Sequence, residues 1–424
     1  MSSQPKVAAY LNSITKFFLK CLALGISYCI PKSDRIWIFG GWFGERFADN
    51  SRYFYLYCHY NKQKLELDRV IWVTRNPRIY RELKSRGCEV YKMWSIPSIW
   101  YHLRGRIHVI DQSFRDVNDI FSVRLKIINL WHGFPLKKIG NYCTNSRDEK
   151  LYLTKFLKNY CADLNLRVNG KNYYLLATSE FSAEILSQAF GVERENMLLS
   201  GYPRNDIFLL ENLDRYITES ERAVLTGIKK MKNEKKVVVY LPTFRDSHST
   251  NLFGIRVANE LAVFNEFLGK HNILLITKFH FAEKGSSSSG GLDLDNIINL
   301  HPESDVYPFL KIADLLITDY SSVYFDYLLT QKPIIFYPYD LEYYAHKDRG
   351  FIFDYQEYTP GPKVYALAEL QEVMLQVLSK DVIGGEYFHQ RESLRDKIHD
   401  CSRIPGSEYL VNEIKRKVLS EKIC

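Results

Sequence analysis

The sequence contains no run of eighteen uncharged apolar residues, so it offers no clear transmembrane helix. None of its eight cysteines forms a C-x-x-C pair, which leaves neither a zinc knuckle nor a redox motif indicated. Free thiols in a reducing cytosol are the simplest interpretation. The sequence also lacks a G-x-G-x-x-G segment. Asp293-Leu294-Asp295 is an Asp-x-Asp pair, but it follows a Gly/Ser-rich loop rather than a strand, so we expect no metal site there.

The composition is that of a folded globular protein. The 424 residues suggest two or three domains of ordinary size, with 46% hydrophobic and 25% charged residues. The formal net charge is +8 and the pI about 8.8. This positive excess suits a polyanionic substrate, a nucleotide or an anionic membrane surface, without choosing between them.

The N-terminal segment, residues 1–33, predicts a helix rather than a signal peptide. Lys16 and Lys20 interrupt the apolar stretch, and no small-x-small cleavage site follows. In a helix, one side would carry most of the residues Leu11, Ile14, Phe18, Cys21, Leu22 and Ile26. Such an amphipathic helix either lies on a membrane or packs on its own domain, and the sequence leaves both open.

Beyond residue 33, strands and helices alternate, which predicts an α/β fold with parallel sheets. A charged helical stretch at 211–236 separates two such series. We therefore expect an N-terminal Rossmann-like domain at 34–215 and a C-terminal one at 216–395. The last segment, 396–424, is expected to be helical and to return to the first domain.

One βαβ unit places polar side chains where α/β sheets bind ligands. The apolar strand 315–317 ends at Asp319-Tyr320-Ser321-Ser322, a helical pattern follows, and 334–337 reads as the next strand. Ligands sit outside the carboxyl ends of such strands, and a helix N-terminus there favours an anion. The alternative is that Ser321 or Ser322 is only a helix N-cap.

Two histidines follow strands in the same way. His132 comes after the strand 126–130 and is followed by Lys137 and Lys138, a combination that suits a base acting near phosphates. His280 comes after the strand 272–278. A lone histidine is more often structural. Two histidines, each directly after a strand, favour a ligand-binding site at the strand ends.

These segments carry a family resemblance. Trp131-His132-Gly133, Gly-Tyr-Pro-Arg-Asn-Asp at 201–206, Pro-Thr-Phe-Arg-Asp at 242–246, and Thr-Asp-Tyr-Ser-Ser at 318–322 resemble the CDP-glycerol glycerophosphotransferase family. That family contains teichoic acid primases, polymerases and related capsule polymerases. The resemblance runs in order across most of residues 35–362. Phe134 stands where the family has Thr, and Phe244 where it has Trp.

The resemblance implies a GT-B-like architecture of two Rossmann-like halves facing a cleft, and transfer of a polyol phosphate from a CDP-linked donor to a hydroxyl, releasing CMP. His132 would be the general base, and His280 would contact the donor phosphates. The remaining donor-site candidates are Arg204, Thr243, Arg245, Asp319, Ser321, Ser322 and Asp326. The acceptor- or phosphate-adjacent candidates are Asp49, Asn50, Lys137, Lys138 and Arg349. Asp326 could equally be a structural partner. No metal or cofactor is expected beyond the CDP-linked donor.

Alternatives remain at this point. One is a nucleotide-sugar-dependent GT-B glycosyltransferase, and another is a non-catalytic protein that binds anionic polymers or a membrane surface. Within the first hypothesis, the polyol (glycerol or ribitol), the acceptor (lipid-linked or polymeric glycan) and the pathway (teichoic acid or capsule) are open. We expect a cytoplasmic protein, peripheral on the inner face of a bacterial cell membrane, without a nucleic-acid partner.

Overall fold

The structure, a computed structural model, describes residues 4–143, 170–243, 252–255, 258–278, 294–347, 350–379 and 385–420. The chain forms two compact units. Unit 1 comprises residues 1–132, 143–206 and 400–424, and unit 2 comprises 133–142 and 207–399. The chain passes to unit 2 after Asp206 and returns to unit 1 after His399, whereas the boundaries expected from the sequence are 215/216 and 395/396. Residues 133–142 join unit 2, which the sequence did not predict.

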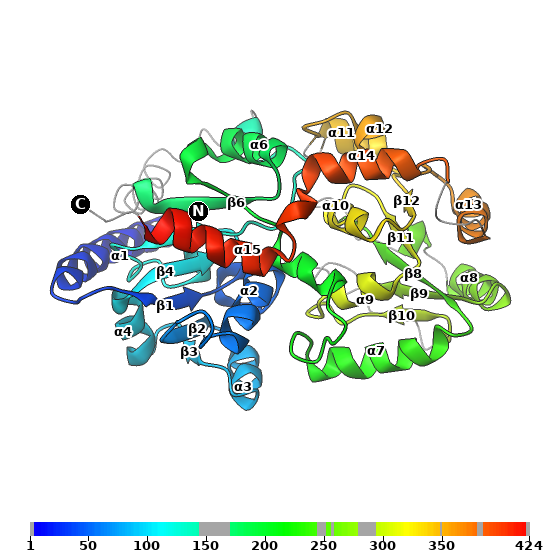
Figure 1. Cartoon of the computed structure of the whole chain (residues 1–424). Coiled ribbons are helices and arrows are strands. Elements are labelled where there is room, and N and C mark those ends of the chain that lie inside the picture. The colour runs from blue at the N-terminus through cyan, green and yellow to red at the C-terminus, as the bar shows by residue number, and fades with distance from the viewer. Residues whose placement is uncertain are drawn as a thin grey trace. The chain divides into compact units, whose positions relative to one another are not determined.

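Unit 1 is built on a seven-stranded sheet in the order β3-β2-β1-β4-β5-β6-β7, with every described pair of neighbours parallel (Figure 1). Its strands are β1 Ser33–Phe39, β2 Arg69–Thr74, β3 Val90–Lys92, β4 Gly105–Ile110, β5 Lys126–Asn129, β6 Tyr173–Ala177 and β7 Met197–Leu199. Its helices are α1 Gln4–Tyr28, α2 Asp49–Tyr60, α3 Pro77–Ser85, α4 Ile96–Arg104, α6 Glu180–Phe190 and α15 Gly406–Glu413. Most residues of these strands are buried, and most of the buried ones are apolar, because helices cover both faces of a parallel sheet.

Unit 2 repeats this plan around a five-stranded parallel sheet in the order β10-β9-β8-β11-β12. Its strands are β8 Lys236–Leu241, β9 Ile273–Thr277, β10 Ile297–Asn299, β11 Leu315–Thr318 and β12 Ile334–Phe336. Its helices are α7 Glu219–Met231, α8 Ala258–Lys270, α9 Tyr307–Ile312, α10 Val323–Tyr327, α11 Leu341–Lys347, α12 Tyr355–Tyr358, α13 Leu367–Ser379 and α14 Phe388–Ile398. None of the described helices is both long and apolar enough to cross a membrane.

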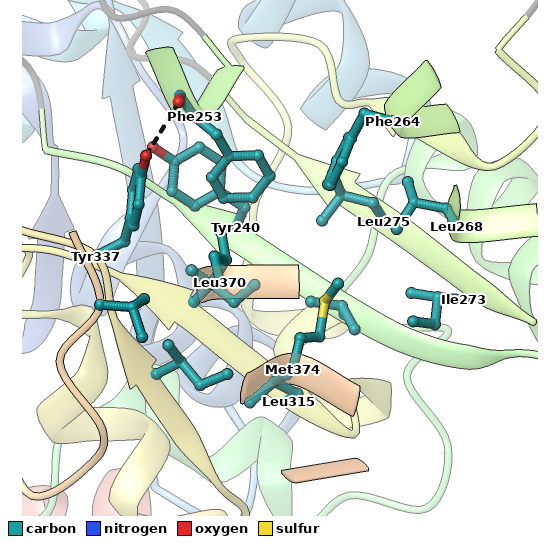
Figure 2. Packing of buried hydrophobic residues seen from close by; sticks show 14 residues of the cluster. Tyr240, Phe253, Phe264, Leu268, Ile273, Leu275, Leu315, Tyr337, Leu370 and Met374 are labelled. Carbon is teal, nitrogen blue, oxygen red and sulfur yellow. Dashed lines mark hydrogen bonds between the residues drawn. The ribbon is translucent and has the colours of Figure 1, made fainter. Parts of the chain in front are cut away.

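The core of unit 2 joins α8 and α13 to one face of its sheet. Figure 2 shows Phe264 and Leu268 of α8 and Met374 of α13 packed over strand residues. The ring of Phe253 stacks on that of Tyr240 with centroids 4.0 Å apart. The main-chain oxygen of Phe253 accepts a hydrogen bond from the hydroxyl of Tyr337 (3.2 Å). This packing covers one face of β8, β11 and β12; Thr243 follows β8, and Asp319, Ser321 and Ser322 follow β11.

The C-terminal segment is anchored to unit 1 through the last residue of the Gly-Tyr-Pro-Arg-Asn-Asp turn. The carboxylate of Asp206 accepts the main-chain N–H groups of Gly406 (2.5 Å) and Ser407 (2.9 Å). These are N–H groups at the start of α15, which have no partner within the helix. The hydroxyl of Ser200 also donates to the oxygen of Gly406 (2.8 Å). The turn at 201–206 is therefore rigidly tied to α15.

A buried histidine connects α4 to the loop that follows β4. Nδ1–H of His102 donates to the main-chain oxygen of Ser98 (2.7 Å), while Nε2 accepts from the N–H of Asn118 (3.1 Å). The ring of His108 lies edge-on, with centroids 5.0 Å apart. Burial lowers the pKa of His102 to about 4. A second proton, on Nε2, would point at the N–H of Asn118, so the network requires neutral His102.

We expect this network to make unit 1 sensitive to acid. His102 is protonated near pH 6.5 in the unfolded chain and only near pH 4 in the folded chain. The unfolded chain therefore binds this proton more tightly, and the free energy of unfolding falls as the pH drops from 6.5 to 4. The loss from His102 amounts to about 3 kcal/mol over that range. Urea unfolding at several pH values should show that the free energy of unfolding falls less steeply with decreasing pH in His102→Gln than in the wild-type chain. His389→Gln, at a ring that is 90% exposed, is the control, and an unchanged slope in His102→Gln would contradict the assignment.

Candidate active site

In unit 1, the candidates Asp49, Asn50, His132 and Arg204 come together beyond the carboxyl ends of the strands. Asp49 and Asn50 begin α2, the helix after β1, and His132 follows β5. Nη1 of Arg204 donates to Oδ1 of Asp49 (2.5 Å) and to the main-chain oxygen of His132 (3.0 Å). Nδ2 of Asn50 donates to the main-chain oxygen of Trp131 (2.8 Å). The sequence placed His132 and Arg204 in strand-end segments and gave Asp49 and Asn50 as acceptor- or phosphate-adjacent candidates, but it did not predict these contacts.

The ring of His132 is half-buried between two tryptophans. Its centroid lies 3.8 Å from that of Trp131 and 6.0 Å from that of Trp42. Trp131 has φ +52 and Gly133 φ +130, so the chain on both sides of His132 adopts conformations that are costly for most residues. The loop therefore has an uncommon main-chain conformation, and it places the imidazole between the two indole rings.

Two buried carboxyl groups that sequence reasoning missed organise the same strand ends. Asp116 accepts the N–H groups of Gln112 (2.8 Å) and Phe43 (2.7 Å), among others. Asp111 accepts both the N–H (2.9 Å) and the hydroxyl (2.5 Å) of Ser51. Burial raises the pKa of Asp111 well above its usual value, and the neighbouring Asp49 and Asp116 raise it further. Asp111 directly follows a strand and Ser113-x-x-Asp116 is a capping box, so both had a sequence signal.

The glycine pair after β1 makes room for these carboxyl groups. A Cβ on Gly40 would lie 2.0 Å from the main-chain oxygen of Asp116, and one on Gly41 would lie 2.7 Å from Oδ2 of Asp111. Neither gap admits a side chain. The Gly-rich turn is therefore explained by the close approach of the β4 loop to the end of β1.

In unit 2, the candidates Thr243 and Asp319 meet at the carboxyl ends of β8 and β11. Oδ1 of Asp319 accepts the N–H groups of Thr243 (2.8 Å) and Tyr320 (2.5 Å). The hydroxyl of Tyr355 donates to the main-chain oxygen of Asp319 (3.0 Å). The side chain of Asp319 is buried, so it joins the two loops rather than facing a ligand.

Ser321 and Ser322 lie next to this junction, and both are partly exposed. Ser322 precedes α10 but its side chain forms no capping bond. Within the described part of the chain neither hydroxyl has a hydrogen-bond partner, so the N-cap alternative is not observed. The helix is shorter than expected: α10 has five residues and continues as a 3-10 turn, Leu328–Thr330. Any contribution of a helix dipole is correspondingly small, and the hydroxyls are the groups available to an anion.

Asp326 is buried and structural. Its Oδ2 accepts a hydrogen bond from the hydroxyl of Tyr307 (2.7 Å), which joins α10 to α9. Only 1% of Asp326 is exposed. This contact is a structural role for Asp326, and the donor-contact role that the sequence also left open stays a prediction.

Lys137 and Lys138 lie in the segment that belongs to unit 2, whereas His132 belongs to unit 1. Lys137 pairs with Phe351 in an antiparallel bridge, and the N–H of Lys138 donates to the oxygen of Gly350 (3.2 Å). Phe134, which replaces the family's Thr, is buried against the rings of Phe325 (centroids 4.9 Å apart) and Phe353 (5.6 Å). An apolar residue at 134 therefore anchors this segment in unit 2.

Three candidates, Arg245, His280 and Arg349, lie outside the described residues. Among the described residues, no group of three or more His, Cys, Asp or Glu side chains is arranged to hold a metal ion.

We expect the contact between Tyr307 and Asp326 to support stability without serving nucleotide binding. Tyr307→Phe should lower the free energy of unfolding by about 1.5–3 kcal/mol, since a hydrogen bond to a buried carboxylate is lost. Chemical denaturation measures this, and calorimetric titration with CMP measures the affinity. Tyr409→Phe, at an exposed tyrosine, is the matched control. Loss of CMP affinity in Tyr307→Phe without loss of stability would show that Asp326 faces a ligand.

Comparison with known proteins agrees with the resemblance. The teichoic acid poly(glycerol phosphate) polymerase of Staphylococcus epidermidis is 26% identical over 395 residues, which cover 90% of this chain and 50% of that protein. This chain thus spans about half the length of that polymerase. The teichoic acid glycerol-phosphate transferase of Staphylococcus aureus is 28% identical over 392 residues, covering 89% of this chain and 91% of that protein.

The solved structure of the wall teichoic acid polymerase TagF shares the fold of this chain, with a TM-score of 0.71, 22% identity and 100% coverage of both chains. The likeness confirms the expected α/β, GT-B-like fold. The family model described as CDP-Glycerol:Poly(glycerophosphate) glycerophosphotransferase matches residues 23–415. With its strand-end segments at 131–133, 201–206 and 318–322 inside that match, the chain belongs to the CDP-glycerol glycerophosphotransferase family.

Proposed function

We propose that the protein transfers a glycerol phosphate or ribitol phosphate unit from a CDP-linked donor to a hydroxyl of a lipid-linked or polymeric glycan acceptor, releasing CMP. The product would be a teichoic acid or capsule-type polymer. The observation that carries the proposal is the family match over residues 23–415, which includes His132 and the Ser321-Ser322 pair at strand ends. Members named above are glycerol phosphate polymerases and a glycerol-phosphate transferase.

In this reaction, the acceptor oxygen attacks the β-phosphorus of the donor. A new P–O bond forms, the bond between the β-phosphorus and the bridging oxygen breaks, and its electron pair leaves on CMP. His132 takes the acceptor proton, a step that a positioned base accelerates by about 10²–10⁴-fold. No covalent intermediate is needed, because positioning and charge stabilisation dominate phosphoryl transfer.

The donor pyrophosphate is held from unit 2 in this proposal. Ser321 and Ser322 offer partly exposed hydroxyls, and Asp319 fixes the loop that bears them by holding the N–H groups of Thr243 and Tyr320. Arg245 and His280 would complete the set with positive charge, as the family resemblance implies. Hydroxyl donors and cations together neutralise the charge that develops on the leaving phosphate.

The test is CMP release from CDP-glycerol and from CDP-ribitol, each with and without a lipid-linked or oligomeric acceptor. We expect acceptor-dependent release from one donor, and a loss of about 10²–10⁴-fold in kcat for His132→Ala with donor affinity retained. His389→Ala, at the 90% exposed histidine, is the control. Release from a nucleotide sugar but from neither CDP-polyol would instead establish a glycosyltransferase.

Calorimetric titration with the donor tests the serine pair. Ser321→Ala and Ser322→Ala should each raise the Kd for the donor by up to about tenfold, since each hydroxyl would lose a hydrogen bond to a charged oxygen. Their melting temperatures should stay unchanged, because neither hydroxyl bonds to a described residue. Ser379→Ala, at an exposed helix end in the same unit, is the matched control.

We further propose that α1 binds the inner face of a bacterial membrane. Over residues 14–28, the part of α1 whose side chains the structure describes, the buried side chains are Lys20, Ala23 and Ser27, and Nζ of Lys20 is bonded to the oxygen of Asp119 (3.1 Å). Its outward face presents Phe18 (65% exposed), Leu22 (61%) and Ile26 (44%), one helical turn apart. A helix whose large apolar side chains point away from its own domain suits the boundary between lipid headgroups and acyl chains.

Helix α4 also carries exposed apolar side chains. It contacts α1 and lies beside it in Figure 1. Trp94, Ile96 and Trp100 are exposed on or next to it. The guanidinium of Arg104 lies 5.7 Å from the ring of Trp100, and that of Arg75 lies 6.0 Å from the ring of Trp94. Tryptophan with arginine is the composition that favours an anionic membrane interface.

Flotation with vesicles of phosphatidylglycerol and phosphatidylethanolamine tests the membrane proposal. We expect the wild-type chain to float and the triple variant Phe18→Ser, Leu22→Ser, Ile26→Ser to lose at least about tenfold in binding, because apolar burial is removed. Val224→Ser with Val263→Ser removes exposed apolar side chains from unit 2 and is the control. Equal flotation of both variants would rule out α1 as the binding surface.

A further inference from the structure

Arg204 is buried, and its Nη1 faces two protein acceptors rather than a phosphate. Its side chain is 4% exposed and that of Asp49, its ion-pair partner, is 11% exposed. Nη1 carries two hydrogens, and the two acceptors at 2.5 and 3.0 Å, Oδ1 of Asp49 and the oxygen of His132, take both. A substrate phosphate approaching this nitrogen would have to displace a carboxylate and would be repelled by it.

Asn50, the next residue of α2, also bonds to the loop that contains His132. Its Nδ2 donates to the oxygen of Trp131 (2.8 Å), and its Oδ1 accepts the N–H of Arg204 (3.3 Å). Oδ1 of Asp49 also accepts the N–H of Asn50 (3.0 Å). The consecutive carbonyl groups of residues 131 and 132 are therefore both held, one by Asn50 and one by Arg204.

The loop needs such restraint because its conformation is unfavourable on its own. Trp131 has φ +52, in the left-handed region, which costs about 1–2 kcal/mol for a residue with a Cβ. Asp49, at the start of α2, also has a positive φ (+65). Strained residues persist where surrounding contacts over-determine them, and they gather at functional sites.

We propose that the Asp49–Arg204 ion pair is a positioning device: it fixes the main chain at His132 so that the imidazole is aimed for proton transfer, and it does not bind the donor. Arg204 acts through the carbonyl of His132, and Asp49 orients and neutralises Arg204. This inference rests on the proposed role of His132 as general base, and it changes the role expected for Arg204 from the sequence.

The experiment uses Arg204→Lys, which keeps the positive charge but loses the planar guanidinium group, and Asp49→Asn, which keeps the shape of the side chain but loses its negative charge. We expect kcat to fall by about 10- to 100-fold in each, because small misplacements of a catalytic group have effects of this size. The Kd for CDP-glycerol, measured by calorimetry, should stay within about twofold of the wild-type value. The double variant should lose little more than either single variant, because both disrupt one device.

Arg69→Lys is the matched control. Nη1 of Arg69 pairs with Oε1 of Glu89 (2.7 Å) in the same unit, but Arg69 begins β2, at the opposite end of the sheet from the site. It should alter neither kcat nor donor affinity. A donor Kd raised tenfold or more in Arg204→Lys or Asp49→Asn, or an unchanged kcat in both, would overturn the proposal.

A readout without turnover separates this inference from the proposed function. Diethyl pyrocarbonate modifies accessible neutral histidines, and peptide mass spectrometry reports the rate at His132, with the exposed His389 as internal reference. We expect modification of His132 to become several-fold faster in Asp49→Asn, measured at a temperature at which circular dichroism shows the variant to be folded. An unchanged rate of His132 modification would overturn the positioning role, whichever donor the wild-type chain uses. Absence of CMP release alone would count only against the proposed function.

Discussion

The buried ion pair between Asp49 and Arg204 is the contact on which the geometry around His132 depends. Removing one partner of such a pair leaves an uncompensated charge and costs about 3–5 kcal/mol. The two residues are 155 positions apart in the chain, so the pair fastens the loop after β7 to the beginning of α2. Because Arg204 also holds the carbonyl of His132, the fold cannot relax there without moving the imidazole.

The same physical device recurs in unit 2. Where parallel strands end, main-chain N–H groups leave the sheet ladder and need new acceptors. Ionised carboxylates are acceptors only, so one of them can gather several such groups. Asp319 does this for the loops after β8 and β11, as Asp116 does for the loops after β1 and β4. Acidic residues thus shape the strand ends, and hydroxyl groups such as those of Ser321 and Ser322 are presented from them.

Much of the fold could be predicted because its signals are local. The apolar run at 315–317 lies within β11, and the run at 334–337 includes β12, since a strand buried on both faces has a continuous apolar sequence. Residues 133–142 could not be assigned to unit 2 in this way. Their attachment depends on the bridge between Lys137 and Phe351 and on the burial of Phe134, which are long-range contacts.

For the site, the sequence by itself determined which side chains lie at the ends of parallel strands, because strand and loop alternate in a local pattern. His132, Asp319 and the serine pair were found in this way. Only the tertiary structure decided which of the charged side chains already pair with other groups of the protein. Asp326 is taken by Tyr307, and Arg204 by Asp49 and the carbonyl of His132. A charged side chain is available to a ligand only if no nearer partner neutralises it in the interior, and those partners are brought close by folding rather than by their order in the chain.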